Sequence, residues 1–338
     1  MNRLVNPVLL LALAVLFLLS LGIGSVSLAP GEVLRALLQW QPASDDLREL
    51  AVQHWVIVHE IRLPRVLLAI LVGMSLGTAG AALQGLLRNP LAEPGLLGVS
   101  SSASLGAVLC LYYGYASLSH WLLPGAAMGG AALATLLLYV IARRRGGNLT
   151  LILAGVALSA LAAALTSLAI NLAPTPTDMQ DIVLWLMGSL SDRSFADIHL
   201  SLPFILAGLA LLLACGRQLD ALTLGEDEAG SLGVNLARLR LQIILGTALC
   251  VGASVAVTGA IGFIGLVVPH LLRRWVDYHP SRLLLSSALG GAILLLAADI
   301  LLRLVSGEQE LMLGVVTALL GAPFFLLLVL RQRGSLAR

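Results

Sequence analysis

Charged residues are scarce in this sequence. Asp, Glu, Lys and Arg make up 11% of its 338 residues, whereas soluble globular proteins average about 25%. Lysine is absent, so all twenty basic residues are arginine. With 59% hydrophobic residues and a mean hydropathy of +0.97, this composition excludes a soluble globular protein and indicates a chain that resides in a lipid bilayer.

Cysteine is also rare. Cys110, Cys215 and Cys250 each lie in an apolar segment and lack the spacing of metal ligands. A disulfide framework and a zinc site are therefore excluded, and no metal site is expected. We interpret the three side chains as packing residues.

Long runs without any charge are the main feature that is present. Crossing the hydrocarbon core of about 30 Å takes about 20 helical residues, and several runs reach that length. The first, from Leu4 to Ala29, exceeds the apolar core of about 7–15 residues in a signal peptide, so we interpret it as a retained helix. The sequence predicts an all-α polytopic membrane protein with about ten transmembrane helices, at 4–28, 62–87, 95–113, 118–142, 149–171, 198–216, 239–257, 260–276, 281–303 and 311–331.

The arginines are distributed unevenly between the two sides of this bundle. Fourteen lie near one set of helix ends, and the positive-inside rule makes that side cytoplasmic, with both termini on it. These are Arg3, Arg88, Arg143, Arg144, Arg145, Arg217, Arg238, Arg240, Arg273, Arg274, Arg282, Arg331, Arg333 and Arg338. The six on the other side are Arg35, Arg48, Arg62, Arg65, Arg193 and Arg303.

Two segments of the chain resemble each other. VGMSLGTAGA at 72–81 and VGASVAVTGA at 251–260 share Val, Gly, Ser, Gly and Ala at the same places, and the same offset aligns Pro90 with Pro269. If the repeat unit is five helices, an odd number, the second copy enters the membrane upside down. Inverted repeats of this kind are typical of transporters.

Helix interruptions are predicted at NPLAEPG, 89–95, and at VVPH, 267–270. Irregular backbone at membrane depth is tolerated only where it is buried in protein or lines a cavity. We therefore expect these segments to break helices or to line a pathway. The candidate residues are Asn89, Pro90, Pro94, Gly95, Ser100, Gly259 and Pro269.

The longest polar segment on the predicted cytoplasmic side includes LGEDEAGSLGV at 224–234. Its apolar residues alternate with acids and glycines, which predicts two short helices joined at glycine. A solvated loop is the usual fate of such a charge run, but a solvated loop needs no leucines.

Several further motifs are spread over the chain: EIRLPRVLLAILVG (60–73), RNPLAEPGLLGVS (88–100), LILAGVALS (151–159), WLMGSL (185–190), TGAIGFIGLVVPHLLR (258–273) and GAPFFLLLVL (321–330). Together with LGEDEAGSLGV they make the sequence resemble the permease subunits of ABC importers that take up iron chelates, haem and cobalamin. The resemblance covers essentially the whole chain. It implies a single transmembrane permease domain over 1–338, forming a homodimer in the bacterial inner membrane.

The same resemblance implies partners. Residues 217–238 would form coupling helices that dock in a groove of an ATP-hydrolysing subunit, and a periplasmic binding protein would deliver the substrate. ATP and Mg belong to the ATPase, because no GxxxxGK[ST] loop occurs here; we expect no cofactor in this chain and no enzymatic activity of its own. The expected coupling residues are Leu222, Leu224, Gly225, Glu226, Asp227, Glu228, Leu232 and Gly233.

Arginines on the outer side are candidates for docking the binding protein. By resemblance, Arg62, Arg65 and Arg303 would pair with acids on its two lobes, and the planar guanidinium suits bidentate pairing with carboxylates. The alternative is anchoring of helix ends by snorkelling side chains. Asp299 lies four residues before Arg303, on the same helical face, and we expect the two to pair.

Two other site hypotheses arise from the residues. His270 with Ser100, Ser101, Ser102 and Ser104 raises a serine–histidine hydrolase, but the glycine expected after the serine is missing, so we interpret His270 as a satisfied polar residue at a helix break. Haem ligation would use His, Met or Tyr. The candidates near the outer face, for which structural roles are expected, are Met179, Met187, Tyr112, Tyr113 and His120.

The predicted function is therefore import of haem or another iron complex, with siderophore and cobalamin permeases as alternatives. An ion-coupled secondary transporter is the alternative from another class. That class places ionisable residues near mid-membrane, which these apolar runs lack.

Overall fold

The computed structural model describes residues 4–38, 45–143, 148–305 and 311–336, which form helices and connecting turns with no strand among them. The elements are α1 (Val5–Gly22), α2 (Pro30–Leu37), α3 (Asp45–Val56), the π-helical η1 (Ile57–Arg62), α4 (Leu63–Leu86), the 3-10 turn η2 (Pro94–Leu97), α5 (Val99–Tyr112), η3 (Tyr115–Ser117), α6 (Leu122–Arg143), α7 (Asn148–Asn171), α8 (Pro176–Leu186), α9 (Phe195–Ala214), α10 (Gly216–Leu222), α11 (Glu226–Ser231), α12 (Leu236–Thr258), α13 (Ile264–Leu272), α14 (Pro280–Val305) and α15 (Leu313–Leu336).

Each of the ten predicted transmembrane ranges overlaps mainly with one helix of the structure, in chain order α1, α4, α5, α6, α7, α9, α12, α13, α14 and α15. In the described part of the chain, seven helices are long and apolar enough to span a bilayer. The other three are shorter, namely α5, α13 and the apolar part of α15, Leu313–Leu327. The all-α membrane fold is confirmed, and the count of ten crossings stays a prediction.

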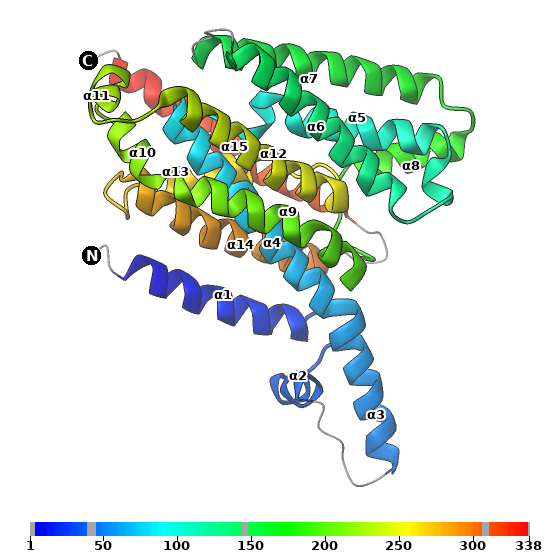
Figure 1. Cartoon of the computed structure of the whole chain (residues 1–338). Helices are drawn as coiled ribbons and strands as arrows, with labels where there is room; N and C mark the ends of the chain where they lie inside the picture. The colour runs from blue at the N-terminus through cyan, green and yellow to red at the C-terminus, as the bar shows by residue number, and fades with distance from the viewer. Residues whose placement is uncertain (1–3, 39–44, 144–147, 306–310, 337–338) are drawn as a thin grey trace.

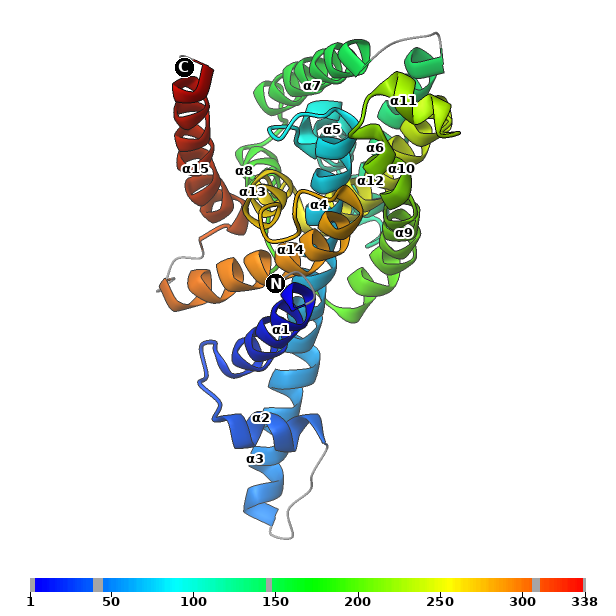
Figure 2. The ribbon, with the colours of Figure 1, turned by 90° about the vertical axis from the view of Figure 1, so that its left-hand side faces the viewer.

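The two ends of the bundle carry different features (Figure 1). At one end lie α10 and α11, here called the knob, and the start of α1 and the end of α15 lie at the same end. At the opposite end, α2 and α3, here called the arm, project beyond the bundle, as Figure 2 also shows. The helix that runs through η1 from Glu49 to Leu86 has 38 residues, a length of about 57 Å. Because this is nearly twice the hydrocarbon thickness of about 30 Å, this helix is longer than one crossing needs, and we interpret the polar arm as the part outside the bilayer.

Small residues bring the central helices into backbone contact. A Cβ added to Gly73 or Gly77 of α4 would lie 2.4 Å or 2.1 Å from the carbonyl oxygen of Gly291 or Ser287 of α14. A Cβ on Gly80 would lie 1.9 Å from the carbonyl oxygen of Gly265. Any larger side chain would force these helices apart, so α4 packs through its glycines as helices in bilayers commonly do.

The packing pattern agrees with two inverted halves of five helices. Counting only the ten predicted spans, α4 is the second and packs against α14, the ninth. In two equivalent halves of five, the second helix corresponds to the seventh, α12, and the ninth corresponds to the fourth, α6. These two corresponding helices also pack together. The repeated segments 72–81 and 251–260 lie on α4 and at the end of α12 respectively.

Two features differ from the sequence-based expectation. The arm and α8 were not predicted, because these helices are short or carry too many polar residues to show as apolar spans. The interruption predicted at VVPH is wrong, since Pro269 lies within α13. The backbone instead leaves the helix at 259–263, whereas the interruption at 89–95 is confirmed by non-helical backbone at 87–93 followed by η2.

Candidate functional site

The knob consists of two short helices joined through glycine. Gly225 precedes α11 with a φ of 136°, and Gly233 follows it with a φ of 86°. Both values lie in the region that only glycine adopts without strain, so glycine is required at these two positions. On α10, Asp220 accepts a hydrogen bond from the backbone N–H of Ser281 (2.9 Å), which fastens the knob to the start of α14.

The leucines of the knob fall into two groups. Leu222 is 1% exposed and packs into the main core, so it holds the knob to the bundle and presents nothing to a partner. Leu224 and Leu232 are 64% and 65% exposed. The prediction that all three leucines form one docking surface therefore needs correcting for Leu222, and only the other two are presented at the surface.

The acids of the knob differ in the same way. Glu226 pairs with Arg240 at the start of α12, with an Nη2–Oε1 distance of 2.9 Å. The carboxylate of Glu228 folds back over Gly225, where a Cβ would lie 1.9 Å from its Oε2. Asp227 has an exposed side chain. Glu226 and Glu228 thus shape the turn, and Asp227 points to solvent.

At the arm end, Asp299 lies between two arginines. Its Oδ2 is 3.0 Å from Nη2 of Arg303, and its Oδ1 is 2.7 Å from Nη2 of Arg65. Arg303 also donates from Nη1 to the carbonyl oxygens of Ser20 (2.9 Å) and Ile23 (2.7 Å). The predicted pair of Asp299 with Arg303 is present, and Arg65 joins it. Since Asp299 is fully buried, this cluster fastens α4 and α14 to the end of α1.

Arg62 does not present its guanidinium to the surface. It is 5% exposed, and it donates from Nη1 to the carbonyl oxygen of Leu21 (2.6 Å) and from Nη2 to that of Val26. A helix end leaves carbonyl oxygens without intrahelical partners, and Arg62 satisfies one of them. In this structure Arg62 anchors α1, as the alternative interpretation proposed, and the docking prediction for this residue is not supported.

Gln84 connects α13, which follows the interruption at 259–263, to the interruption at 87–93. Pro269 has no N–H, so it leaves the carbonyl of Gly265, four residues earlier, without its helical hydrogen bond. Nε2 of the buried Gln84 donates to that oxygen (3.2 Å), and it also lies within 3.3 Å of the carbonyl oxygen of Ala92 in the interruption at 87–93. Arg273 donates to the Oε1 of the same side chain. We call this set of contacts the brace.

Glu93 makes a second connection, between the two interruptions themselves. Its Oε1 accepts a hydrogen bond from the backbone N–H of Phe263 (3.0 Å), which has a left-handed φ of 67°. Burial raises the pKa of the Glu93 carboxyl above its ordinary value, while the Phe263 N–H acts in the opposite direction. A cavity of about 100 Å³ lies here, bordered by Glu93, Ser100 and 260–265.

The remaining candidates for the interruptions occupy defined positions. Asn89 accepts a hydrogen bond from the N–H of Leu91 (2.9 Å) and forms the turn that contains Pro90. Pro94 begins η2, and the carbonyl of Gly95 accepts from Ser159 on α7 (3.3 Å). Gly259 ends α12 with a φ of 71°, and a Cβ there would lie 2.3 Å from the Trp185 carbonyl oxygen. These residues make the irregular backbone, and Gly259 permits its close approach to α8.

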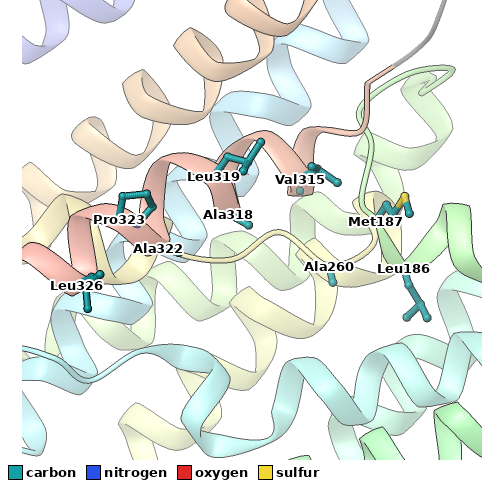
Figure 3. Close-up of a pocket in the computed structure, with 10 residues that line it drawn as sticks. Leu186, Met187, Ala260, Val315, Ala318, Leu319, Ala322, Pro323 and Leu326 are labelled. Atoms are coloured by element: carbon teal, nitrogen blue, oxygen red, sulfur yellow. The ribbon is translucent and has the colours of Figure 1, made fainter.

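A larger cavity of about 730 Å³ lies between α15, the end of α8 and the interruption at 259–263. Figure 3 shows Leu186 and Met187 on one side of it, the side chains of α15 on the other, and Ala260 between them. All ten residues that line it are apolar: Leu186, Met187, Ala260, Gly314, Val315, Ala318, Leu319, Ala322, Pro323 and Leu326. Ala260 borders both this cavity and the smaller one, so the interruption at 259–263 lies between two spaces.

The structure gives little support to the serine–histidine hydrolase hypothesis. Nδ1 of His270 is buried and has no hydrogen-bond partner among the described residues, so the interpretation of a satisfied histidine is not supported for this nitrogen. The ring contacts Phe324 of α15 edge to face (5.9 Å). Ser101 and Ser102 lie with Ser104 on α5, and Ser104 is buried.

Apart from the neighbours Tyr112 and Tyr113, no ring contact, hydrogen bond or ion pair joins the candidate haem ligands among the described residues. Met179 is 48% exposed, and Tyr112 and Tyr113 pack against each other at 5.0 Å between ring centroids. Nε2 of His120 lies 3.7 Å from Oδ1 of Asp197. Of the five, Met187 is the residue that lines the large cavity.

The sequence did not identify Gln84 as a site residue, and Glu93 appeared only as part of the motif RNPLAEPGLLGVS. Gln84 is a lone polar residue in an apolar run, a signal that marks a residue but not its partners. Those partners lie on segments that are 8 and 181 residues away.

Comparison with known proteins adds to this geometry. Residues 12–331 match the FecCD transport family. The chain is 40% identical over 340 residues to the hemin transport system permease protein HmuU of Yersinia pestis, covering 98% of each. It is 46% identical over 280 residues to the vitamin B12 import system permease protein BtuC of Vibrio cholerae, covering 82% of this chain and 84% of the relative.

A solved structure described as an inward-facing conformation of a metal-chelate type ABC transporter is similar to the whole chain. The TM-score is 0.83 at 33% sequence identity, with 97% of this chain and 99% of the other covered.

Proposed function

Because the chain belongs to the FecCD transport family, we propose that it is the permease through which an ABC importer moves haem from the periplasm to the cytoplasm. Permeases of this family are transport proteins and not themselves enzymes. Membership in an ABC importer family leaves the ion-coupled secondary transporter without support. The choice of haem over cobalamin or a siderophore complex is the specific part of this proposal.

The observation that carries the choice of haem is the apolar cavity beside α15. A volume of about 730 Å³ lies within the range of about 300–1,000 Å³ that is usual for small-molecule sites. Every lining residue is apolar, which suits a flat apolar macrocycle better than an amide-rich corrin, because amides entering such a space would lose their hydrogen bonds. A relative that spans 98% of this chain is named a hemin permease, and the relatives named for vitamin B12 are the reason to test both.

The proposed assembly is a homodimer with two ATPase subunits and a binding protein. One of the elements that line the cavity, α15, exposes Leu319 (69%) and Leu326 (60%). A second copy facing this side would close the space on a two-fold axis. The ATPases would bind the knobs, and the binding protein would bind the arm end.

The orientation follows from the arginine distribution. Arg217, Arg238, Arg240 and Arg282 lie on or beside the knob, and the contacts of Arg62, Arg65 and Arg303 lie at the other end. By the positive-inside rule the knob end is cytoplasmic, and the start of α1 and the end of α15 lie at that end. Arg3, Arg144, Arg145 and Arg338, which were assigned to the same side, lie outside the described residues.

A transport assay with three substrates tests this proposal. The chain would be reconstituted in liposomes with its ATPase and binding protein, and ATP-dependent uptake of haemin, cyanocobalamin and a ferric siderophore compared. We expect uptake of haemin only. Ala318→Phe, which fills the cavity, should reduce uptake, while Leu320→Phe on another face of the same helix should not. Uptake of cyanocobalamin at an equal rate would overturn the choice of haem and leave the family assignment intact.

A further inference from the structure

A second hollow in the protein lies beside the knob, apart from the apolar cavity. It has a volume of about 380 Å³ and lies between α10 and the first turns of α12. Two arginines line it, and no acidic residue is among the described residues around it. The lining residues are Arg217, Gln218, Ala221, Leu232, Gly233, Val234, Asn235, Arg238, Leu239 and Gln242.

The two arginines differ from the neighbouring Arg240 in having no ion-pair partner among the described residues. Arg240 is paired with Glu226, and Asp220 accepts from the Ser281 N–H. Arg217 and Arg238 have exposed side chains, and neither takes part in an ion pair between described residues. Two guanidinium groups beside one hollow repel each other unless an anion lies between them, so the hollow is electrostatically suited to an anion.

The hollow lies at the start of α12, which packs against α9, and both helices are long and apolar enough to span a bilayer. Gln242 donates from Nε2 to the carbonyl oxygen of Leu211 (3.0 Å), which ties α12 to α9 at this level. On α12, Arg238, Gln242 and Leu245 follow each other at helical spacing on one face. Leu245 and Leu213, on the two packed helices, are each 39% exposed, and Leu206 is 53% exposed further along α9. These exposed leucines form an apolar strip on the same two helices as the basic hollow.

We propose that this hollow binds the phosphate headgroup of an anionic phospholipid, with Arg217 and Arg238 on the phosphate and the acyl chains along α9 and α12. Arginine pairs bidentately with phosphate, and basic pockets between transmembrane helices bind anionic headgroups at the cytoplasmic surface. The strip favours a lipid over free phosphate, which has no apolar part. It also favours a lipid over an acidic segment of the ATPase, because the strip runs along membrane-spanning helices. The inference depends on the proposed orientation only in placing the bound lipid in the cytoplasmic leaflet.

The position of the hollow gives this site a consequence for transport. Leu232 and Gly233 belong to the end of the knob and also line the hollow. A headgroup bound there would contact the segment that is proposed to bind the ATPase. The lipid would therefore stabilise the knob in the position seen here.

The test measures lipid binding on the full-length chain, without transport. Protein purified in detergent would be titrated with phosphatidylglycerol or phosphatidylcholine, and bound lipid counted by native mass spectrometry. The double variant Arg217→Gln, Arg238→Gln should bind phosphatidylglycerol about thirtyfold more weakly, the product of two arginine contacts at about five- to sixfold each. The control is Arg282→Gln, which removes an exposed arginine of the same end that lies 3.6 Å from Asp277.

Three results would overturn the inference. One is equal phosphatidylglycerol binding by the double variant and the control. Another is displacement of bound phosphatidylglycerol by inorganic phosphate at millimolar concentration, which would make the hollow a simple anion site. The last is loss of ATPase association by the double variant in lipid-free detergent, which would assign the arginines to the protein partner. Because none of these measurements involves haem, failure here is distinguishable from failure of the proposed function.

Discussion

The arm end and the knob end both carry charges that the sequence marks as docking residues, but the two ends use them differently. At the arm end, Arg62 and Arg303 are 5% and 10% exposed, and their guanidinium groups bond to the end of α1. At the knob, Leu224 and Leu232 are exposed while Glu226 is paired inside the turn. The charges of the arm end thus hold that end together, whereas the knob presents two leucines together with the exposed acid Asp227.

This difference shows that a charged residue cannot be assumed to be exposed, nor an apolar residue to be buried. A buried ion pair is fixed by its partners, and removing one member leaves the other without compensation. An exposed leucine beside glycines with positive φ is held in place by the backbone instead. The arm end should therefore respond to mutation mainly in stability, and the knob mainly in partner binding.

The largest effect is expected at Asp299. Asp299→Ala would leave the guanidinium groups of Arg65 and Arg303 without their carboxylate, at a cost of about 3–5 kcal/mol in the free energy of unfolding. Thermal unfolding of the purified chain in detergent measures this. Asp227→Ala, which removes an exposed acid of the knob, is the matched control and should leave the midpoint unchanged. Equal midpoints for both variants would mean that the arm-end cluster contributes nothing to stability.

At the knob, Leu222 and Leu232 form a matched pair. Leu222→Ala removes a fully buried side chain and should cost about 2–5 kcal/mol, whereas Leu232→Ala, at 65% exposure, should stay within about 0.5 kcal/mol. Partner binding should show the opposite order, since Leu232→Asp places a charge in the proposed apolar contact with the ATPase. Co-purification of the ATPase checks this. Normal co-purification and coupled ATP hydrolysis with Leu232→Asp would remove this leucine from the coupling surface.

The sequence predicted the fold better than it predicted these contacts. Charge-free runs located a helix in each of the ten ranges because the bilayer imposes a length and an apolar composition on each span. The arm, which we interpret as lying outside the bilayer, carries no such signal. Leu222 and Leu232 look alike in the sequence, and only the packing of α10 on the bundle distinguishes them.

The error at Pro269 has a specific physical cause. A proline inside a helical pattern usually ends or kinks the helix. Here a side chain from α4 supplies the hydrogen bond that the carbonyl of Gly265 would otherwise lack. This contact joins residues 181 positions apart, so local sequence signals could not show it.

An intermediate effect is expected at the brace. Gln84→Leu would leave the Gly265 carbonyl and Arg273 without a partner, at about 1–3 kcal/mol. Because the brace joins α13 to the interruption at 87–93, haemin uptake per ATP hydrolysed should fall as well. Gln180→Leu, an exposed position on α8, is the control for added apolar surface. A lower unfolding midpoint with unchanged uptake per ATP would restrict Gln84 to a structural role.

The smallest effect is expected at Arg65, and it decides whether the arm end has any docking charge. Arg65 is 18% exposed, more than Arg62 or Arg303, and Arg303 would still pair with Asp299 if Arg65 were lost. Arg65→Gln should therefore lower binding-protein affinity by only about 0–1 kcal/mol, through the association rate and chiefly at low salt. Arg62→Gln is the control, because its buried guanidinium should leave the association rate and its salt dependence unchanged. Surface plasmon resonance at two ionic strengths measures both variants. If Arg65→Gln showed the same rates as the unmodified chain at low salt, all three arginines would be structural, and the binding protein would have to recognise other residues of the arm end.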